Sequence, residues 1–97
     1  MPRPRICRRI KFKPGVTYFK PAGIRITELK ETNLTFEEYE TIRLIDLENI
    51  GQSKAGKMMK ISQPTLSRLL KSARKKIADS IIKGKAIRIE GGNYEFR

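Results

Sequence analysis

The clearest pattern of apolar and polar positions lies in residues 63–83. At 100° per residue, a helix over this range is apolar on one arc and cationic on the opposite arc. The apolar arc consists of Leu66, Leu69, Leu70, Ala73, Ile77 and Ile81, and the cationic arc holds Pro64, Arg68, Lys71 and Lys75. Ser62 offers a capping hydroxyl, Pro64 suits the first turn, and Gly84 ends the helix. The pattern predicts a helix about 31 Å long with one packed face and one free face.

A shorter helix is expected immediately before it, from a cap at Ser53 through Met59. Two helices that meet near a right angle bring their backbones close, and Gly56 lies where that approach is expected, so only a small residue suits it. The side chains predicted to fill the corner are Ala55, Met59, Ile61, Leu66 and Leu69. Residues 52–77 thus have the pattern of a helix-turn-helix.

A third helix is predicted to start at Thr35, which forms a capping box with Glu38. Asn49 to Gly51 ends it. Its apolar residues are Phe36, Tyr39, Ile42 and Ile45 on one stripe, with Leu44 and Leu47 outside that stripe. The helix is therefore expected to be covered on two sides, by the helix pair and by the N-terminal segment or a second subunit. Its acids are interpreted as a solvated face that avoids DNA, not as catalytic carboxylates.

Short extended segments flank the helices. Pro14-Gly15 fits a type II turn, which predicts a small hairpin of residues 10–12 and 17–19. Tyr18 and Phe19 suit the core better than base stacking. Residues 24–29 fit either an extended stretch or a brief helix. Residues 86–90 and 94–97 alternate around a Gly-Gly-Asn turn, which predicts a C-terminal hairpin that pairs with N-terminal strands or with a twin subunit.

Together these elements predict a mainly α protein with small β elements, of the α+β class. The expected organisation of the 97 residues is one domain: a basic arm at 1–9, a β or irregular segment at 10–34, a three-helix helix-turn-helix core at 35–83 and a β-hairpin at 85–97. The chain has no run of about 18 apolar residues and no apolar N-terminal region. A cytoplasmic, nucleoid-associated protein is expected.

The distribution of charge along the chain indicates the kind of partner. The net charge is +12, and residues 26–50 hold seven acids and only two bases. Residues 1–25 hold eight bases and no acid, and residues 51–88 hold eleven bases against Asp79. A solvated cationic surface is the plain alternative, but the basic blocks coincide with the predicted helix pair, which favours nucleic acid. A membrane-surface helix is disfavoured because residues 63–83 lack Phe and Trp.

The N-terminal arm and the lone cysteine limit the chemistry. Arg3, Arg5, Arg8 and Arg9 are candidates for DNA phosphates or the minor groove; a solubilising tail, or a segment held by the acids at 28–48, is the alternative. Cys7 is the only cysteine and histidine is absent. A metal site of nitrogen and sulfur ligands within one subunit is therefore excluded, as is a Cys-His or Ser-His catalytic pair. Neither a cofactor nor an enzyme is expected, and Cys7 is interpreted as a small, semi-buried side chain.

The chain also resembles known proteins. Its middle is similar to the last DNA-binding region of bacterial sigma-70-type factors. The positions that carry this likeness are Leu34, Thr35, Ile42, Arg43, Leu44, Asp46, Gly51, Gln52, Ser53, Ile61, Ser62, Ser67, Arg68 and residues 73–76. The segments MPRPRICRRI, VTYFKPAGI and GKAIRIEGGNYEF resemble a small, largely uncharacterised family of predicted DNA-binding proteins of archaea and bacteria. The resemblance covers nearly the whole chain and implies a helix-turn-helix fold.

Two positions depart from that pattern. Lys60 stands at the turn position usually held by glycine, so a left-handed or altered turn is expected at a cost of roughly 1 kcal/mol. Lys54 and Lys57 replace the acids that often begin the first helix, where cations oppose the helix dipole. The exchange suggests that these two charges serve phosphate binding.

The resulting hypothesis is sequence-selective binding of duplex DNA by a homodimeric transcription regulator. The start of the second helix is expected in the major groove, with Gln63 on adenine, Arg68 on guanine and Pro64 or Thr65 on a thymine methyl. Ser67 is a weaker base or phosphate candidate. The predicted phosphate contacts of the helix pair are Lys54, Lys57, Lys71, Arg74 and Lys75. The alternatives are a structured-RNA or ribosome-associated protein and a sigma-like adaptor that contacts RNA polymerase through residues 36–48.

Overall fold

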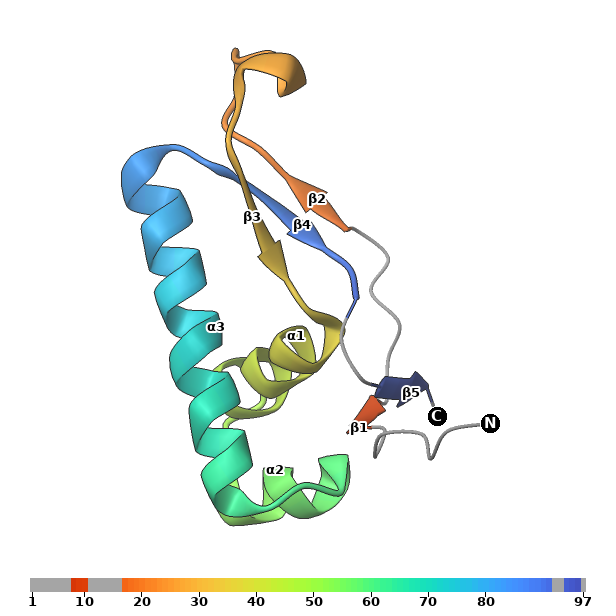
Figure 1. Cartoon of the computed structure of the whole chain (residues 1–97). Coiled ribbons are helices and arrows are strands. Elements are labelled where there is room, and N and C mark those ends of the chain that lie inside the picture. Colours follow the sequence, from red (N-terminus) through yellow and green to blue (C-terminus); the bar gives the residue numbers. More distant parts are fainter. Residues whose placement is uncertain (1–7, 11–16, 92–93, 97) are drawn as a thin grey trace.

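The computed structural model describes residues 8–10, 17–91 and 94–96 of the chain. Three α-helices and two small sheets are found in this part, which confirms the α+β class. In chain order the elements are β1 (Arg8–Ile10), β2 (Tyr18–Phe19), the 3-10 helix η1 (Ile26–Glu28), β3 (Glu31–Leu34), α1 (Phe36–Ile42), η2 (Arg43–Leu47), α2 (Gln52–Met59), α3 (Gln63–Lys83), β4 (Ala86–Ile89) and β5 (Tyr94–Phe96). Figure 1 shows α3 running along one side of the molecule, with the larger sheet against its C-terminal half and α2 at its start.

The helix starting at Thr35 begins as the sequence predicts. The Glu38 amide donates to Thr35 Oγ1 over 3.2 Å, and the Thr35 amide donates to Glu38 Oε1 over 2.9 Å, so the capping box is complete. After Ile42 the helix widens into the π-helical segment η2, whose last turn is closed by the Glu48 amide on Arg43 O. Asn49 then adopts a left-handed conformation with φ of 59°. The predicted break after Glu48 is therefore confirmed.

The larger sheet has β4 at its centre. β4 pairs antiparallel with β2, with Tyr18 opposite Arg88, and parallel with β3, with Leu34 opposite Ile89. The crossover between the parallel strands carries all three helices (Figure 1). For residues 24–29 the sequence left open an extended stretch or a brief helix, and the structure has the brief 3-10 helix η1 there. The strand β3 that follows was not predicted.

The predicted C-terminal hairpin is wrong in its pairing, and of the predicted N-terminal hairpin the described residues show β1 and β2 in different sheets. β1 pairs in parallel with β5, while β2 and β4 belong to the other sheet. The physical reason is visible at Gly91, whose carbonyl accepts the Phe36 amide over 3.0 Å. This bond ties the chain after β4 to the first turn of α1, so it runs on towards β1 instead of folding back on β4. The expectation that the tail pairs with N-terminal strands is confirmed. The turn at 13–16 lies outside the described residues.

Two apolar clusters hold the helices. One fills the corner between η2, α2 and α3, with Leu44, Ala55, Met59 and Leu66 almost fully buried. The other joins the sheet to α1 and α3 through Leu34, Ala73 and Ile89, with Phe36, Tyr39 and Ile42 packed against them. The prediction of two covered sides is thus confirmed, and the second cover includes the chain's own sheet.

Three predictions about individual burial are wrong. Leu47 is 71% exposed on η2, and Ile81 is 71% exposed because the buried side of α3 at this level is the one that carries Ser80. Phe19 is 53% exposed at the edge of β2 and is not a core residue. The buried position near the end of α3 belongs to Ser80, whose hydroxyl donates to Lys76 O over 2.8 Å. Apolar character alone does not predict which side a neighbouring strand covers.

Candidate nucleic-acid interface

The turn between α2 and α3 has the predicted close approach. Lys60 is left-handed, with φ of 58° and ψ of 44°, and the Ile61 amide donates to Gly56 O over 2.9 Å. A Cβ added to Gly56 would lie 3.1 Å from Ile61 O, an atom of the backbone. Since backbone gives way less readily than a flexible side chain, position 56 favours glycine. The expectations for Gly56 and Lys60 are both confirmed.

The two helices are capped differently. Ser62 caps α3, because its Oγ accepts the Thr65 amide over 3.3 Å. The predicted cap at Ser53 is wrong: α2 starts one residue earlier, with Gly51 as its N-cap and no side-chain hydrogen bond there. Gly51 has the extended conformation of a cap residue, and its carbonyl accepts the Ala55 amide over 2.9 Å. Ser53 is exposed within the helix instead.

The predicted base-reading residues lie on the first two turns of α3. Gln63, Pro64, Ser67 and Arg68 are exposed, while Thr65 is half-buried and its hydroxyl accepts the Ser62 hydroxyl over 2.9 Å. Within the described chain, the side chains of Gln63 and Arg68 have no hydrogen bond or ion pair. They are available to an external partner on a helix whose position is fixed by the corner cluster.

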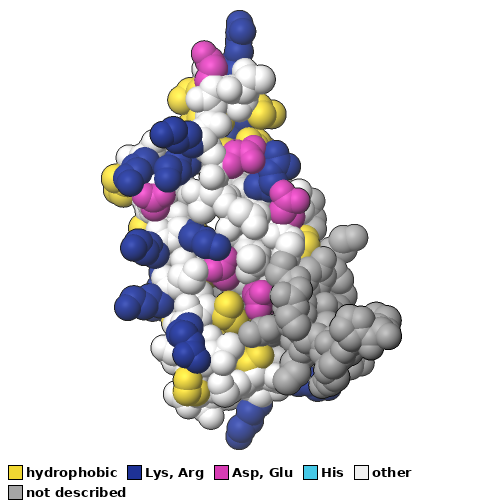
Figure 2. Space-filling model, viewed as in Figure 1, with side chains coloured by type: hydrophobic (Ala, Val, Ile, Leu, Met, Phe, Trp, Pro, Cys, Tyr) yellow, Lys and Arg dark blue, Asp and Glu magenta, His cyan; other side chains and the backbone are white. Residues whose placement is uncertain are grey.

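Cations surround these turns. Lys54 and Lys57 of α2 and Lys71 and Lys75 of α3 are exposed, and none of them is paired with another described residue. Figure 2 shows dark-blue side chains along the side of the molecule that α3 occupies. Four of the five phosphate contacts predicted for the helix pair are thus unpaired cations on its surface.

Arg74, the fifth, is engaged elsewhere. Its guanidinium holds the Asp46 carboxylate with two hydrogen bonds, Nη2 to Oδ1 over 2.6 Å and Nε to Oδ2 over 3.2 Å. The hydrogen bond from Arg74 lowers the pKa of Asp46, although slight burial opposes that shift. Arg74 therefore connects α3 to η2, and its predicted role as a free phosphate contact is not the role seen here.

Of the four N-terminal arginines, the structure describes the backbone of two. Arg3 and Arg5 lie outside the described residues. The backbone of Arg8 and Arg9 is part of β1, opposite Tyr94 and Glu95, while their side chains are not described. The boundary predicted for a free arm at residue 9 is therefore wrong by at least two residues, because β5 pairs with that end.

The acids of α1 are not a solvated face, so that interpretation is wrong. Glu37, Glu38 and Glu40 are buried. Arg43 holds Glu40 through Nε over 2.7 Å and Nη2 over 3.0 Å. A buried carboxylate is retained only when it is paired or hydrogen-bonded; the sequence indicates the Thr35 and Arg43 partners through local spacing, but not Ser72 and Lys76, which are more than 30 residues away.

Glu38 is the centre of the most extensive of these networks. It accepts hydrogen bonds from Lys76 Nζ over 2.8 Å, from the Ser72 hydroxyl and from the Thr35 amide. Burial opposes ionisation of Glu38, but the bonds from Lys76, Ser72 and Thr35 outweigh it and hold its pKa below the ordinary value. Lys76 also donates to Asn33 O over 2.9 Å. One carboxylate thus fixes α3 against the start of α1 and the end of β3.

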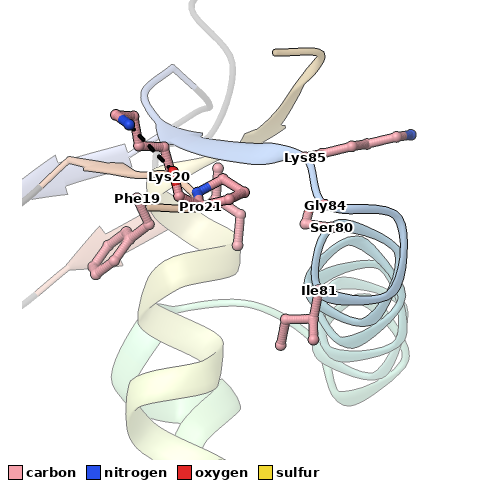
Figure 3. A pocket seen from close by; sticks show the side chains of 8 residues that line it. Phe19, Lys20, Pro21, Ser80, Ile81, Gly84 and Lys85 are labelled. Carbon is pink, nitrogen blue, oxygen red and sulfur yellow. Dashed lines mark hydrogen bonds between the residues drawn. The ribbon is translucent and has the colours of Figure 1, made fainter. Parts of the chain in front are cut away.

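A second surface feature lies at the far end of α3. An open apolar hollow of about 310 Å³ separates the end of β2 from α3, and its lining includes Phe19, Pro21, Ile81 and Ile87. Figure 3 shows Phe19 and Pro21 on the strand side and Ile81 pointing from α3 across the hollow. Ile82, next to it, is 82% exposed. The hollow and the exposed Ile82 lie at the opposite end of α3 from Arg68.

Metal and membrane chemistry find no support in the described residues. Nowhere among them do three or more Asp, Glu, His or Cys side chains gather as a metal site would require. No helix within residues 8–10, 17–91 and 94–96 is long and apolar enough to cross a membrane.

The fold and surface define a class: a small α+β protein in which a cationic helix pair is fixed to a mixed sheet. The chain belongs to the family described as "Protein of unknown function DUF134", which matches residues 1–97. It is similar to a "UPF0251 protein" of Thermoanaerobacter pseudethanolicus, 53% identical over 94 residues that cover 97% of this chain and 80% of the relative. The expected membership of a largely uncharacterised family with bacterial members is thereby confirmed.

Two further relatives carry the same family name. A "UPF0251 protein" of Caldanaerobacter subterraneus is 55% identical over 95 residues, covering 98% of this chain and 80% of the relative. One of Moorella thermoacetica is 55% identical over 94 residues, covering 97% of this chain and 63% of the relative. No solved structure matches the chain.

Proposed function

We propose that this chain binds duplex DNA sequence-selectively, with α2 and α3 acting as a helix-turn-helix, and that it regulates transcription. The observation that carries the proposal is the surface of α3: Gln63 and Arg68 stand exposed and unpaired within the described chain, on a helix start flanked by unpaired lysines of both helices. A helix start presented in this way fits the major groove, which admits one α-helix.

Rigid support strengthens the case. Base readout needs side chains held in register, and α3 is fixed by the corner cluster on one side and by the Glu38 network on another. Gln63 and Arg68 have the donor and acceptor groups that pair with adenine and guanine edges. Lys54, Lys57, Lys71 and Lys75 supply the charges that phosphates attract and set the register without reading sequence.

Selection from a random pool of duplexes, followed by fluorescence anisotropy, tests the proposal. Arg68→Ala should lose about 1–3 kcal/mol of discrimination between the selected and a random duplex. Lys57→Ala is the matched control, since it should weaken both duplexes alike. Equal losses on both duplexes for Arg68→Ala would contradict the assigned roles.

Salt dependence provides an independent measurement. If six to ten phosphates are engaged, affinity falls about a thousandfold or more between 50 and 200 mM salt. A shallow slope would indicate a protein or small-molecule partner. Structured RNA that outcompetes every duplex would favour the RNA alternative, and RNA polymerase capture that survives Arg68→Ala would favour the sigma-like adaptor.

The regulator is proposed to act as a homodimer through the apolar patch of Phe19, Ile81 and Ile82. A second copy is the proposed occupant because the patch lies at the end of α3 farthest from the reading turns, so pairing leaves both readers free. From Pro64 to Ile82 the helix rises about 27 Å at 1.5 Å per residue. Sedimentation of Ile81→Ser/Ile82→Ser should show a monomer, while a wild-type monomer would refute the dimer. Nucleoid association follows from DNA binding and shares its tests.

A further inference from the structure

A second hollow, distinct from the reading turns, lies between α3 and the edge strand β3. It is an open groove of about 410 Å³ whose lining residues all carry polar or charged groups: Thr32, Ser72, Lys75, Lys76, Asp79, Lys83 and Lys85. We name these residues the lysine groove. The lining holds four lysines and one aspartate, and since Glu38 pairs with Lys76 beneath it, an excess of two positive charges remains. Asp79 lies eleven residues beyond Arg68, which is about 16 Å along the helix axis.

One carboxylate orders two of the lysines. Lys83 Nζ lies 3.1 Å from Asp79 Oδ1, and Lys85 Nζ lies 2.7 Å from Asp79 Oδ2. Asp79 and Lys85 are only 28% and 25% exposed. A single negative charge does not neutralise two ammonium groups, so this cluster keeps a net positive charge while its geometry is fixed. Such an arrangement lowers the conformational cost of binding an anion.

Lys75 and Lys76 of α3 and Thr32 of β3 supply the remaining donors. Lys76 is held by Glu38 and by Asn33 O, so its ammonium is also fixed at the wall of the groove. The side chains of Lys75 and Thr32 have no hydrogen bond or ion pair with another described residue. An ammonium and a hydroxyl are therefore available to a ligand beside three ammonium groups that the protein orders itself.

We propose that the lysine groove binds a phosphate-bearing anion. Lysine ammonium groups are common phosphate ligands, and the volume suits a small polyanion. The lining holds no aromatic side chain on which a base could stack, so recognition is directed at phosphate alone. The anion has two sources: a free polyphosphate, or the backbone of a nucleic acid that extends past the reading turns. The inference does not depend on the proposed base readout.

Calorimetry with sodium pyrophosphate, in parallel with anisotropy on duplex DNA, tests the groove. Lys75→Gln and Lys83→Gln/Lys85→Gln should each lower the affinity for the anion that binds in the groove by about tenfold or more. This is the usual effect of losing a hydrogen bond to a charged group. Lys75→Gln removes no contact within the described chain, so it also guards against misfolding of the double variant. Lys54→Gln/Lys57→Gln is the charge-matched control, because it removes two cations from α2.

The outcomes separate cleanly. Loss of pyrophosphate binding in the groove variants, with the α2 control within about twofold of wild type, assigns the groove to a free polyphosphate. Loss of DNA affinity in Lys83→Gln/Lys85→Gln beyond that of the α2 control, without saturable pyrophosphate binding, assigns the groove to nucleic acid backbone; Lys75→Gln does not decide this point, because Lys75 is also a proposed phosphate contact of the helix pair. If neither ligand distinguishes the groove variants from the α2 control, the groove is not an anion site. A wild type that binds pyrophosphate but no duplex would refute the proposed function and leave this inference standing.

Discussion

Replacing Glu38 by glutamine tests whether the buried carboxylate holds the helices together. The glutamine side chain has the same shape but carries no charge and offers one acceptor oxygen instead of two; of the three groups that donate to residue 38, only the Ser72 hydroxyl can also accept from its amide. Glu38 now accepts from Lys76, Ser72 and Thr35 and is almost fully buried. At least one of these donors loses its acceptor in Glu38→Gln.

The size of the effect follows from the kind of bond lost. Hydrogen bonds to a charged group contribute about 1.5–3 kcal/mol, and Lys76 is one-third exposed, so we expect the free energy of unfolding to fall by about 2 kcal/mol. For a chain of this length that corresponds to a decrease in Tm of roughly 8–16 °C. Urea unfolding at pH 7, followed by circular dichroism, measures the difference. Glu28→Gln is the matched control, because Glu28 is exposed in η1.

The pH dependence gives a second measurement. The pKa of Glu38 is lowered in the folded state, so the stabilisation by its charge is fully present above the unfolded pKa. It is lost as pH falls through the folded pKa, and the gap between wild type and Glu38→Gln should narrow below about pH 4. Unfolding within about 0.5 kcal/mol of wild type at pH 7 would refute the reasoning. So would a gap unchanged at acid pH.

Three further predictions concern the helix pair and its surroundings. Gly56→Ala should destabilise the protein by about 1–3 kcal/mol in urea unfolding, since the added Cβ meets Ile61 O. The control Ser53→Ala should change stability by less than about 0.5 kcal/mol, because Ser53 is not the cap. A neutral Gly56→Ala would contradict the close approach. Lys60→Gly should raise Tm through relief of about 1 kcal/mol of left-handed strain, and a lower Tm would contradict it. Asp46→Asn should cost less than about 1 kcal/mol because its pair with Arg74 is exposed; a larger loss would show that this pair carries the contact between η2 and α3.

Local signals in the sequence predicted local structure well. The capping box at Thr35, the cap at Ser62, the left-handed Lys60 and the stop at Gly84 each depend on a few neighbouring residues. Pairing between strands depends on segments far apart in the chain, so the strand order β2-β4-β3 and the parallel β1-β5 pair were missed.

In the candidate interface, too, local features were predicted from the sequence and long-range pairings were not. The exposure of Gln63, Pro64 and Arg68 follows from helical periodicity, and the structure agrees with it. The pairing of Arg74 with Asp46, 28 residues away, has no periodic signal. Nor has the burial of Glu38 beneath Lys76. These partners are set by how α1, η2 and α3 cross, which composition and spacing do not encode.

The central place of β4 has a consequence for folding during synthesis. The strands that flank it, β2 and β3, are made long before residues 86–89 leave the ribosome, and each needs β4 for its hydrogen bonds. The corner of η2, α2 and α3, by contrast, draws on residues close together in the chain and is complete well before β4 is made. Nascent chains should therefore acquire their helical corner first and remain prone to wrong strand association until β4 arrives.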